Sequence, residues 1–396
     1  MNIYITRHGQ TDLNKAHLMQ GRTDAPLNAH GRQQAVEAAQ QVKGIHFDAV
    51  YSSPLKRAVD TASIISGWDK KDIITDEMKL KNIGYSLNDI SIIIKNKNIK
   101  KYALKNEYDS ELMDYVNTKG FDINNLSKYK EYKKNNIDAS IEDTIKIVNL
   151  GLNIEYSDKL INIINHKYFI NSRVNRYLEY TGKNNIAEII KYVNCDRDRE
   201  FYTKILQTNT EKGILMLVNK YYYLNDSFTG LDLVNIESNY GTGQMNQEAY
   251  NAFKKLSDDA RNQGLNILVK SGYRDFYTQQ SIYNGYLQTN GEWWTNLMSA
   301  KAGHSEHQTG LAVDVQTYST YNLRDFLYTN EYNWMINNSY KYGFILRYPE
   351  NTRDTTGYDF EPWHYRYVGI EAAKIIHDEN LLFEEYYSYY IQKQDN

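Results

Sequence analysis

The sequence predicts a multidomain protein in three parts: a truncated α/β fragment over residues 1–76, a mainly helical region over 77–210 and an α+β domain over 211–396. A chain of 396 residues is too long for one typical core, because domains average about 150 residues. Strand-like and helix-like patterns alternate in the first and last parts, whereas the middle part is rich in Lys, Asn, Ile and Tyr. These shifts in pattern set the two predicted boundaries.

The first part begins with the order strand, helix, strand, helix. We expect strands over 1–6 and 47–54, and helices over 31–42 and 55–65. This alternation is typical of the start of an α/β sheet.

The middle part contains an internal repeat. Five positions recur 48 residues later: Asn117, Lys119, Phe121, Tyr129 and Tyr132 return as Asn165, Lys167, Phe169, Tyr177 and Tyr180. Periods of this length indicate helical units that stack to share a core. We interpret this part as a helical spacer or wall-binding region, with its lysines on a solvated face.

The third part alternates helices and strands. Asn246 is suited to cap a helix whose apolar positions are spaced by four, three and four residues. Gly343 is suited to end a second helix over 331–343, and a third is expected over 370–381. Strands are expected over 214–224, 265–274, 310–316, 344–349 and 363–369.

The composition narrows the kinds of partner and site. With 46 Lys and Arg against 49 Asp and Glu, the chain carries a net charge of −3 and no overall basic field for nucleic acid. A single cysteine, Cys195, excludes an intrachain disulfide and a zinc site built on several thiolates. Because 37 residues are Tyr, we expect much of the core to be tyrosine whose hydroxyls need partners.

Two short motifs of the third part bring together the residue types of a catalytic zinc site. Three of the nine histidines fall in them, and they also contain two carboxylates. Catalytic zinc takes three protein ligands and leaves a place for water. His307, Asp314 and His364 offer N, O and N donors for one zinc ion per chain, and the chain can turn at Gly310 between the first two.

Other side chains near these motifs have separate predicted roles. Glu361 lies three residues before His364 and can act as a general base without binding the metal. His304 is expected to structure its loop. Tyrosines and tryptophans between 273 and 294 either line a groove for substrate or belong to the core.

The third part resembles the VanY-type D-alanyl-D-alanine carboxypeptidases, from about Leu217 to Ala373. The family pattern Ser-x-His-x-x-Gly-x-Ala-x-Asp is met over residues 305–314, and Glu-x-x-His over 361–364. The upstream Ser-Gly-Tyr-Arg is met over 271–274, with Gln279 at the family's following Gln. The region that opens near residues 80–90 also looks like the helical region that precedes the catalytic domain in such proteins.

The resemblance implies a reaction and a role for each residue. Zinc would sit on the three ligands named above, and Glu361 would pass a proton from zinc-bound water to the leaving D-Ala amine. Arg274 would hydrogen-bond the scissile carbonyl oxygen as negative charge grows there. Ser305 and Gln279 would hold the substrate backbone or its terminal carboxylate. The implied partners are peptidoglycan stem peptides ending in D-Ala-D-Ala.

Two alternatives use the same site. One is an L,D-carboxypeptidase or a peptidoglycan endopeptidase, and the other is a wall-binding protein with a vacant metal site. Measurement of the zinc content distinguishes the wall-binding protein with a vacant site from a zinc enzyme. Release of D-Ala distinguishes a peptidase from the phosphatase that the first part of the chain suggests.

The first part resembles the histidine phosphatase (phosphoglycerate mutase-like) superfamily. The matching motifs lie over residues 7–11, 21–27 and 52–58. The resemblance implies that His8 is transiently phosphorylated, with Arg7 and Arg57 clamping the phosphoryl oxygens. After about Asp76 the sequence leaves this pattern before the family's later acid and second histidine. We therefore expect a fragment without phosphatase activity, and keep a histidine phosphatase as the alternative.

The N-terminal sequence and the implied substrate predict different cellular locations. The N-terminus has Arg7 and His8 where a signal peptide would be apolar, and no apolar run approaches the length needed to span a bilayer. As written, the chain is expected to be cytoplasmic and to have no transmembrane segment. The implied substrate, in contrast, belongs to the cell envelope.

Overall fold

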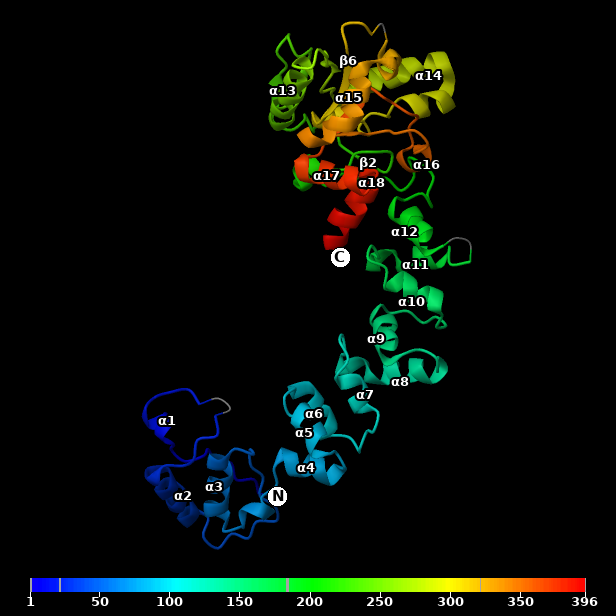
Figure 1. Cartoon of the computed structure of the whole chain (residues 1–396). Helices are drawn as coiled ribbons and strands as arrows, with labels where there is room; N and C mark the ends of the chain where they lie inside the picture. The colour runs from blue at the N-terminus through cyan, green and yellow to red at the C-terminus, as the bar shows by residue number, and fades with distance from the viewer. Residues whose placement is uncertain (1, 21–22, 183–184, 321, 396) are drawn as a thin grey trace. The chain divides into compact units, whose positions relative to one another are not determined.

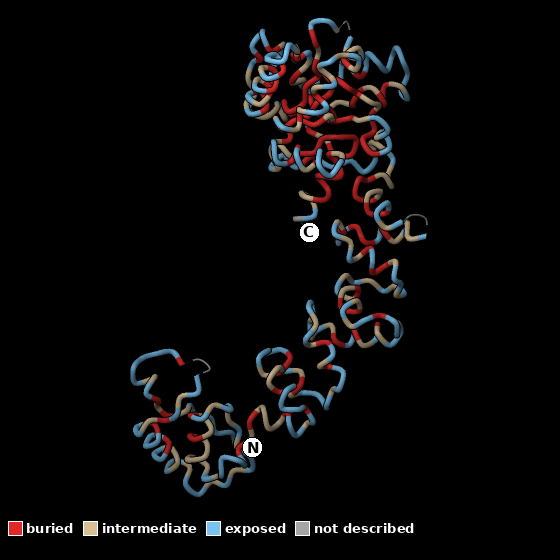
Figure 2. Tube along the Cα trace, in the orientation of Figure 1, coloured by how far each residue is buried: buried red, intermediate tan, exposed pale blue. Residues whose placement is uncertain are grey.

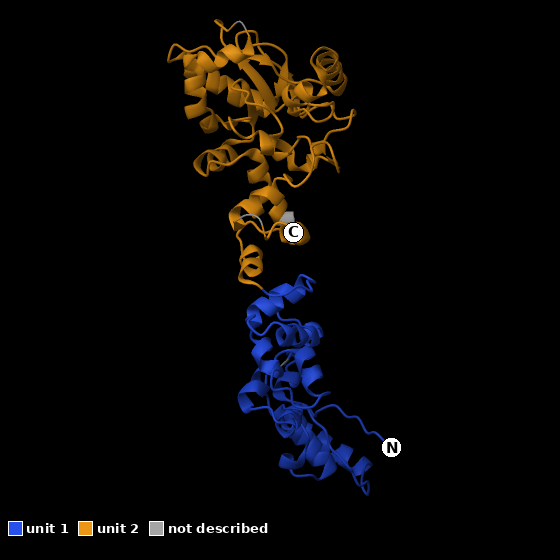
Figure 3. Cartoon of the chain, turned by 90° about the vertical axis from the view of Figure 1, so that its right-hand side faces the viewer, with its two compact units in different colours: residues 1–156 blue, residues 157–396 orange. Residues whose placement is uncertain are grey.

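The computed structural model describes residues 2–20, 23–182, 185–320 and 322–395. It forms two compact units, residues 1–156 and 157–396 (Figure 3). The division between them falls inside the predicted middle region, so the three-part boundaries stay a prediction. Gly21 and Arg22 of the phosphatase-like motif lie outside the described residues.

The first 75 residues are helical where helices were expected, but the two predicted strands are wrong. The helices are α1 (Asp12–Lys15), α2 (Ala29–Gln41), α3 (Lys56–Ser66) and η1 (Lys70–Asp72). Among the described residues of this part, the β-structure is one isolated bridge between Tyr51 and Ile74. Ile3 and Ile5 are 71% and 91% exposed. A strand needs neighbours on its edges and a layer on its face, and this short sequence supplies neither.

The region from residue 76 to 194 is helical, as predicted. In the first unit it comprises α4 (Asp76–Ile83), α5 (Leu87–Ile93), α6 (Lys97–Ala103), α7 (Leu112–Val116), η2 (Ile123–Asn125), α8 (Leu126–Asn135) and α9 (Ile141–Asn149). The second unit continues with α10 (Asp158–Ile164), η3 (Asn171–Arg173), α11 (Val174–Leu178) and α12 (Ile186–Asn194).

The internal repeat is also a repeat of structure. The hydroxyl of Tyr129 donates to Oδ1 of Asn149 at 2.6 Å, and that of Tyr177 donates to Oδ1 of Asn194 at 2.5 Å. In each copy the asparagine amide donates to the carbonyl just before the repeated phenylalanine, at 2.8 and 2.9 Å. Both tyrosine rings are fully buried. These two buried hydroxyls therefore find the partners that buried tyrosines need, whereas the hydroxyls of Tyr132 and Tyr365 have no hydrogen-bond partner among the described residues.

The second unit is built on a four-stranded antiparallel sheet in the order β5-β6-β8-β7. Its strands are β5 (Leu268–Ser271), β6 (Ala312–Gln316), β8 (His364–Tyr367) and β7 (Phe344–Leu346). Four of the five predicted strands thus form. Their buried residues pack with helix α13 (Gln247–Arg261) in one core, and Figure 1 shows α13 and α14 on either side of β6.

Helix α13 follows its predicted pattern. Oδ1 of Asn246 accepts from the backbone N–H of Ala249 at 3.0 Å, which caps the helix. All four predicted apolar positions, Ala249, Phe253, Leu256 and Ala260, are fully buried. The sequence missed a long helix, α14 (Phe276–Met298), which bends where Gly291 takes a φ of 76°.

The fifth predicted strand, over 214–224, is wrong except for β2 (Tyr222–Tyr223). Oδ1 of Asn219 accepts from the backbone N–H groups of Tyr221 and Tyr222, at 2.9 and 3.2 Å. A side chain that bonds its own neighbouring backbone competes with strand pairing. This local turn explains why an apolar, tyrosine-rich run does not stay extended.

The remaining elements of this unit are short, apart from two helices. They are β1 (Leu206–Gln207), η4 (Thr210–Leu215), β3 (Leu233–Asn235), β4 (Gln244–Asn246), η5 (Glu306–Thr309), η6 (Leu323–Tyr328), α15 (Asn330–Asn338), η7 (Ser339–Tyr342), α16 (Arg353–Thr356), α17 (Ile370–Asp378), α18 (Phe383–Tyr386), η8 (Tyr387–Ile391) and η9 (Gln392–Asp395). Gly343 ends η7 in the left-handed region, as predicted. Figure 2 shows long buried stretches through this unit. Within the described residues, the helices are too short or too polar to cross a bilayer.

Candidate metal centre

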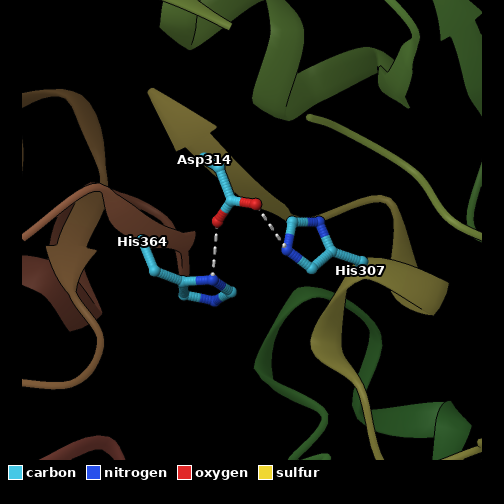
Figure 4. A group of neighbouring side chains, drawn as sticks. All are labelled: His307, Asp314 and His364. Carbon is cyan, nitrogen blue, oxygen red and sulfur yellow. Dashed lines mark hydrogen bonds and ion pairs between the residues drawn. The ribbon is translucent and has the colours of Figure 1, made fainter. Parts of the chain in front are cut away.

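The three predicted ligands lie together (Figure 4). Oδ2 of Asp314 is 3.3 Å from Nε2 of His307, and Oδ1 of Asp314 is 3.0 Å from Nδ1 of His364. One donor atom from each residue lies within 4.8 Å of the other two, and all three side chains are buried. The fold therefore brings together His307 and His364, which are 57 positions apart in the sequence.

The sheet register explains two of the three positions. Asp314 on β6 pairs directly with His364 on β8, and on its other side it pairs with Ser271 on β5. Residues directly opposite each other in an antiparallel pair point to the same face. The pairing of β6 with β8 therefore places the side chains of Asp314 and His364 next to each other.

His307 reaches the same point because η5 ends in a tight turn. Gly310 has a φ of 77°, and a Cβ there would lie 2.5 Å from the side chain of Leu233. The left-handed backbone angle is one that glycine adopts without strain, and the tip of the Leu233 side chain can shift. Nδ1 of His307 is 2.7 Å from the carbonyl oxygen of Gly272, so the other ring nitrogen faces Asp314.

The pKa shifts of the three candidate ligands differ from one residue to the next. Burial raises the pKa of Asp314, but the two imidazoles outweigh it and hold that pKa below its ordinary range. Burial lowers the pKa of His364, but the nearby carboxylates of Asp314 and Glu306 outweigh it and raise that pKa to about 9. Burial dominates at His307 and lowers its pKa. Two nitrogens and a carboxylate in this arrangement match the ligands of catalytic zinc.

Glu361 stands at the edge of the cluster. Its Oε2 lies 3.7 Å from Nδ1 of His364, and its side chain is 11% exposed. Burial raises its pKa to about 8, against a lowering by His364. A carboxyl group with a raised pKa beside a candidate metal site has the properties of a general acid or base.

Arg274 is held in place by two neighbours. Its Nη1 donates to Oε1 of Gln279 at 2.7 Å, its Nη2 donates to Oγ of Ser271 at 3.1 Å, and Nη2 is 3.8 Å from Oδ2 of Asp314. The Gln279 amide also donates to the carbonyl of Ala300 at 2.7 Å, and the residue is 1% exposed. Gln279 is thus already fully bonded, so its predicted contact with substrate stays a prediction.

A cavity of about 560 Å³ contains the cluster. Ser305, Glu361 and Arg274 line it, as the sequence led us to expect. The sequence missed other lining residues, which come from η6, from the segments after β7 and α16, and from the turn before β8: Arg324, Tyr348, Tyr358 and Trp363.

The aromatic residues between 273 and 294 divide between both predicted roles. Tyr286 and Trp294 line the cavity, whereas Tyr283 is buried and donates to Asn296 at 2.7 Å. Trp293 is 70% exposed. His304 is buried with Nδ1 2.7 Å from the carbonyl of Asn219, which agrees with a structural role.

Comparison with known proteins identifies this region. Residues 242–370 match the model of the VanY family, D-alanyl-D-alanine carboxypeptidase. The putative carboxypeptidase YodJ of Bacillus subtilis is 40% identical over 184 residues, which cover 44% of this chain and 67% of YodJ. The bifunctional D-Ala-D-Ala dipeptidase and D-Ala-D-Ala carboxypeptidase VanXYC of Enterococcus gallinarum is 36% identical over 130 residues, covering 32% of this chain and 68% of that protein. The chain belongs to the VanY family.

Among solved structures, the LdcB LD-carboxypeptidase is similar to this VanY-family chain. It is 38% identical, with a TM-score of 0.44, and the match covers 47% of this chain and 90% of that one. The chain spans between about half and two thirds of the length of the curated carboxypeptidases that it matches.

A second match covers the N-terminal part of this VanY-family chain. Residues 3–86 match the model of the histidine phosphatase superfamily (branch 1). The uncharacterized phosphatase PhoE of Bacillus subtilis is 42% identical over 83 residues, which cover 21% of this chain and 43% of PhoE. The match is therefore to part of a phosphatase.

The structure brings two of the three predicted phosphatase residues together. Nε of Arg57 donates to Nε2 of His8 at 3.1 Å, and Nη1 of Arg57 donates to the carbonyl of Thr23 at 2.5 Å. Arg57 is buried, whereas Arg7 is exposed. A clamp of two arginines around His8 stays a prediction.

Proposed function

We propose that this chain is a zinc-dependent D,D-carboxypeptidase that removes the terminal D-Ala from peptidoglycan stem peptides. The observation that carries the proposal is the buried cluster of His307, Asp314 and His364, with Glu361 and Arg274 in the same cavity. Membership of the VanY family supports the same reaction class.

The donor set supports zinc as the metal. Two imidazole nitrogens and one carboxylate oxygen are the ligand types that zinc takes in catalytic sites, where a fourth position stays open. Bound zinc lowers the pKa of its water to about 7 and polarises a carbonyl oxygen.

The surrounding side chains supply the rest of the chemistry. Glu361 accepts a proton at one carboxylate oxygen and delivers it to the leaving amine, because it borders the cluster without being one of its three donors. Arg274 donates to the scissile carbonyl oxygen as negative charge develops. Its guanidinium is already oriented by Gln279 and Ser271.

The cavity also suits an anionic peptide end. Arg324 lines the same cavity as Arg274, so its guanidinium group is available to a terminal carboxylate. Ser305 lines the same cavity and offers a hydroxyl to the peptide backbone. A D-Ala-D-Ala terminus carries both groups, a carboxylate and a backbone amide.

Digestion of muropeptides tests the proposal. The purified chain is incubated with pentapeptide and tetrapeptide muropeptides, with a chelator or with added zinc, and the products are read by mass. We expect pentapeptide stems to lose one alanine, the chelator to stop the reaction and zinc to restore it.

Two variants sharpen this test. Glu361→Gln should abolish alanine release, whereas Glu350→Gln, an exposed carboxylate nearby in sequence, should keep it. Full activity of Glu361→Gln would contradict the proposal. Shortening of tetrapeptides alone would favour an L,D-carboxypeptidase, and cleavage of cross-linked dimers would favour an endopeptidase.

A further inference from the structure

A buried cluster of four charged side chains adjoins the candidate metal centre through one of its members, Glu306. Its members are each at most 5% exposed: Glu306, Arg347, Arg366 and Glu384. We infer that Glu306 is a positioning residue for His364, accepting a hydrogen bond from its Nε2–H and so holding Nδ1 toward the metal. The inference rests on the proposed zinc site and adds a residue that the family resemblance did not single out.

The two ring orientations of the candidate ligands are fixed in different ways. Nε2 of His307 faces Asp314, and its far nitrogen, Nδ1, is 2.7 Å from the carbonyl of Gly272. In His364 the nitrogens are reversed, with Nδ1 facing Asp314 at 3.0 Å. The far nitrogen of His364 is therefore Nε2, and it lies 3.6 Å from Oε2 of Glu306.

These two atoms have no other partner. Oε2 of Glu306 and Nε2 of His364 are both buried without a hydrogen bond to any described residue. Buried polar atoms are normally paired, and a metal-binding histidine normally donates its second N–H to a carbonyl or a carboxylate. A small movement of either side chain joins the two unpaired atoms in one bond.

The remaining contacts of Glu306 fix its carboxylate. Oε1 accepts from Nε of Arg347 at 2.8 Å and from Nη1 of Arg366 at 3.2 Å. Both arginines are anchored in turn, Arg347 by Glu384 at 2.6 and 2.9 Å and Arg366 by the carbonyl of Met216 at 2.9 Å. One oxygen of Glu306 is thus committed to the arginines, and the other is directed at His364.

A matched pair of variants tests the role in the full-length chain. Glu306→Gln weakens the acceptor at His364 and one partner of Arg347, whereas Glu384→Gln weakens the other partner of Arg347 without touching His364. Loss of the acceptor that orients a metal-binding histidine costs about 10- to 100-fold in metal affinity. We therefore expect Glu306→Gln to bind zinc at least about 10-fold more weakly than the parent in competition with a chromophoric chelator.

The control separates this effect from damage to the fold. Both variants should lower the unfolding temperature of the metal-free protein, because both leave buried arginines short of a carboxylate. Glu384→Gln should nevertheless keep zinc affinity within a few-fold of the parent. Equal zinc affinity in all three proteins, or an equal loss in both variants, overturns the inference. A parent that binds no zinc contradicts the proposed function instead.

A measurement on the parent covers the case in which Glu306→Gln does not fold. Histidine-selective ¹⁵N labelling of the zinc-loaded chain reports the protonated nitrogen of each ring. We expect the His364 Nε2–H proton to resonate downfield of the His307 Nδ1–H proton, because its acceptor is a charged carboxylate rather than a carbonyl. A His364 proton at the position of a non-bonded imidazole N–H overturns the inference.

Discussion

Gln279 shows how one amide orients the guanidinium of Arg274, which we propose as a catalytic group. Its Oε1 accepts from Arg274, and its Nε2 donates to the carbonyl of Ala300. The residue therefore connects the guanidinium to the turn that follows α14. A hydrogen bond to a charged group contributes about 1.5–3 kcal/mol, so its loss is large enough to affect transition-state binding.

We predict that Gln279→Leu lowers kcat/KM for pentapeptide stems by about 10-fold or more, because about 1.4 kcal/mol is tenfold in rate. Zinc stoichiometry should stay unchanged, because Gln279 is not among the three candidate ligands. Steady-state kinetics with metal analysis of the same preparations checks both. Gln280→Leu, the same change on the exposed face of α14, is the control. An unchanged kcat/KM in Gln279→Leu would refute the positioning role.

The sequence predicted some site residues far better than others. His307, Asp314 and His364 stand in short motifs with characteristic spacing, so their roles can be inferred from the order of residues alone. Arg324 and Glu306 carry no such pattern. Arg324 lines the cavity from η6, and Glu306 acquires its arginine neighbours only when β7 and β8 pair. The position of such side chains depends on packing between elements that are distant in the sequence. No local pattern in a single sequence predicts that packing.

At the scale of elements, the repeated Tyr–Asn pair makes the same contacts in two stretches of different length. We predict that Tyr129→Phe and Tyr177→Phe each destabilise the protein by about 1 kcal/mol, the usual net contribution of a hydrogen bond. The two effects should add, because the residues belong to different compact units and share no partner. Hydrogen exchange of α8–α9 and α11–α12 measures each loss locally. Tyr328→Phe, at an 85% exposed ring, should change neither.

The helices of the first unit also contain a pH-dependent contact. Burial raises the pKa of Asp109, but hydrogen bonds from Lys130 at 2.5 Å and Tyr102 at 2.9 Å outweigh it and hold that pKa below its ordinary 3.8. A carboxyl whose pKa is lower in the folded state stabilises the fold above its unfolded value. That contribution disappears as the pH falls through the folded value.

We therefore predict that Asp109→Asn exposes α6 and α8 to faster hydrogen exchange than the parent at pH 7. The difference between the two proteins should shrink as the pH falls below 3.8, where the parent's carboxylate becomes protonated. Asp138→Asn, at an exposed aspartate of the same unit, serves as the control. A difference that persists unchanged into strong acid would contradict this assignment.

Some predicted strands form and others do not, and the difference lies in their pairing partners rather than in their local sequence pattern. The stretches over 310–316 and 363–369 form strands, because each has a partner on both sides in the order β5-β6-β8-β7. The run over 1–6 has the same β-forming residues but no pairing partner among the described residues. The sequence pattern was equally good in both places, and the available neighbours decided the outcome.

At the scale of the whole molecule, the candidate chemistry of the peptidase is confined to one unit. The three candidate ligands, Glu361 and Arg274 all lie within residues 157–396. The histidine motif lies in the other unit, with one buried arginine beside it. The two resemblances therefore concern separate parts of the chain, and a change in one is not required to affect the other.

This separation leads to the prediction that His8→Ala leaves alanine release from pentapeptide stems unchanged. The same variant should not differ from the parent after incubation with a radiolabelled phosphate monoester, with no acid-labile phosphoryl group retained on either. Three features argue for this result: the strand expected to hold His8 does not form, Arg57 already donates to His8 and to the carbonyl of Thr23, and Arg7 is exposed. A phosphoryl group on histidine needs several donors around its oxygens, and this arrangement leaves few.

His46→Ala, at an exposed histidine of the same part, controls for non-specific labelling. Label that is present in the parent and in His46→Ala, but lost in His8→Ala, would establish a working phosphohistidine and reverse the interpretation of the first part.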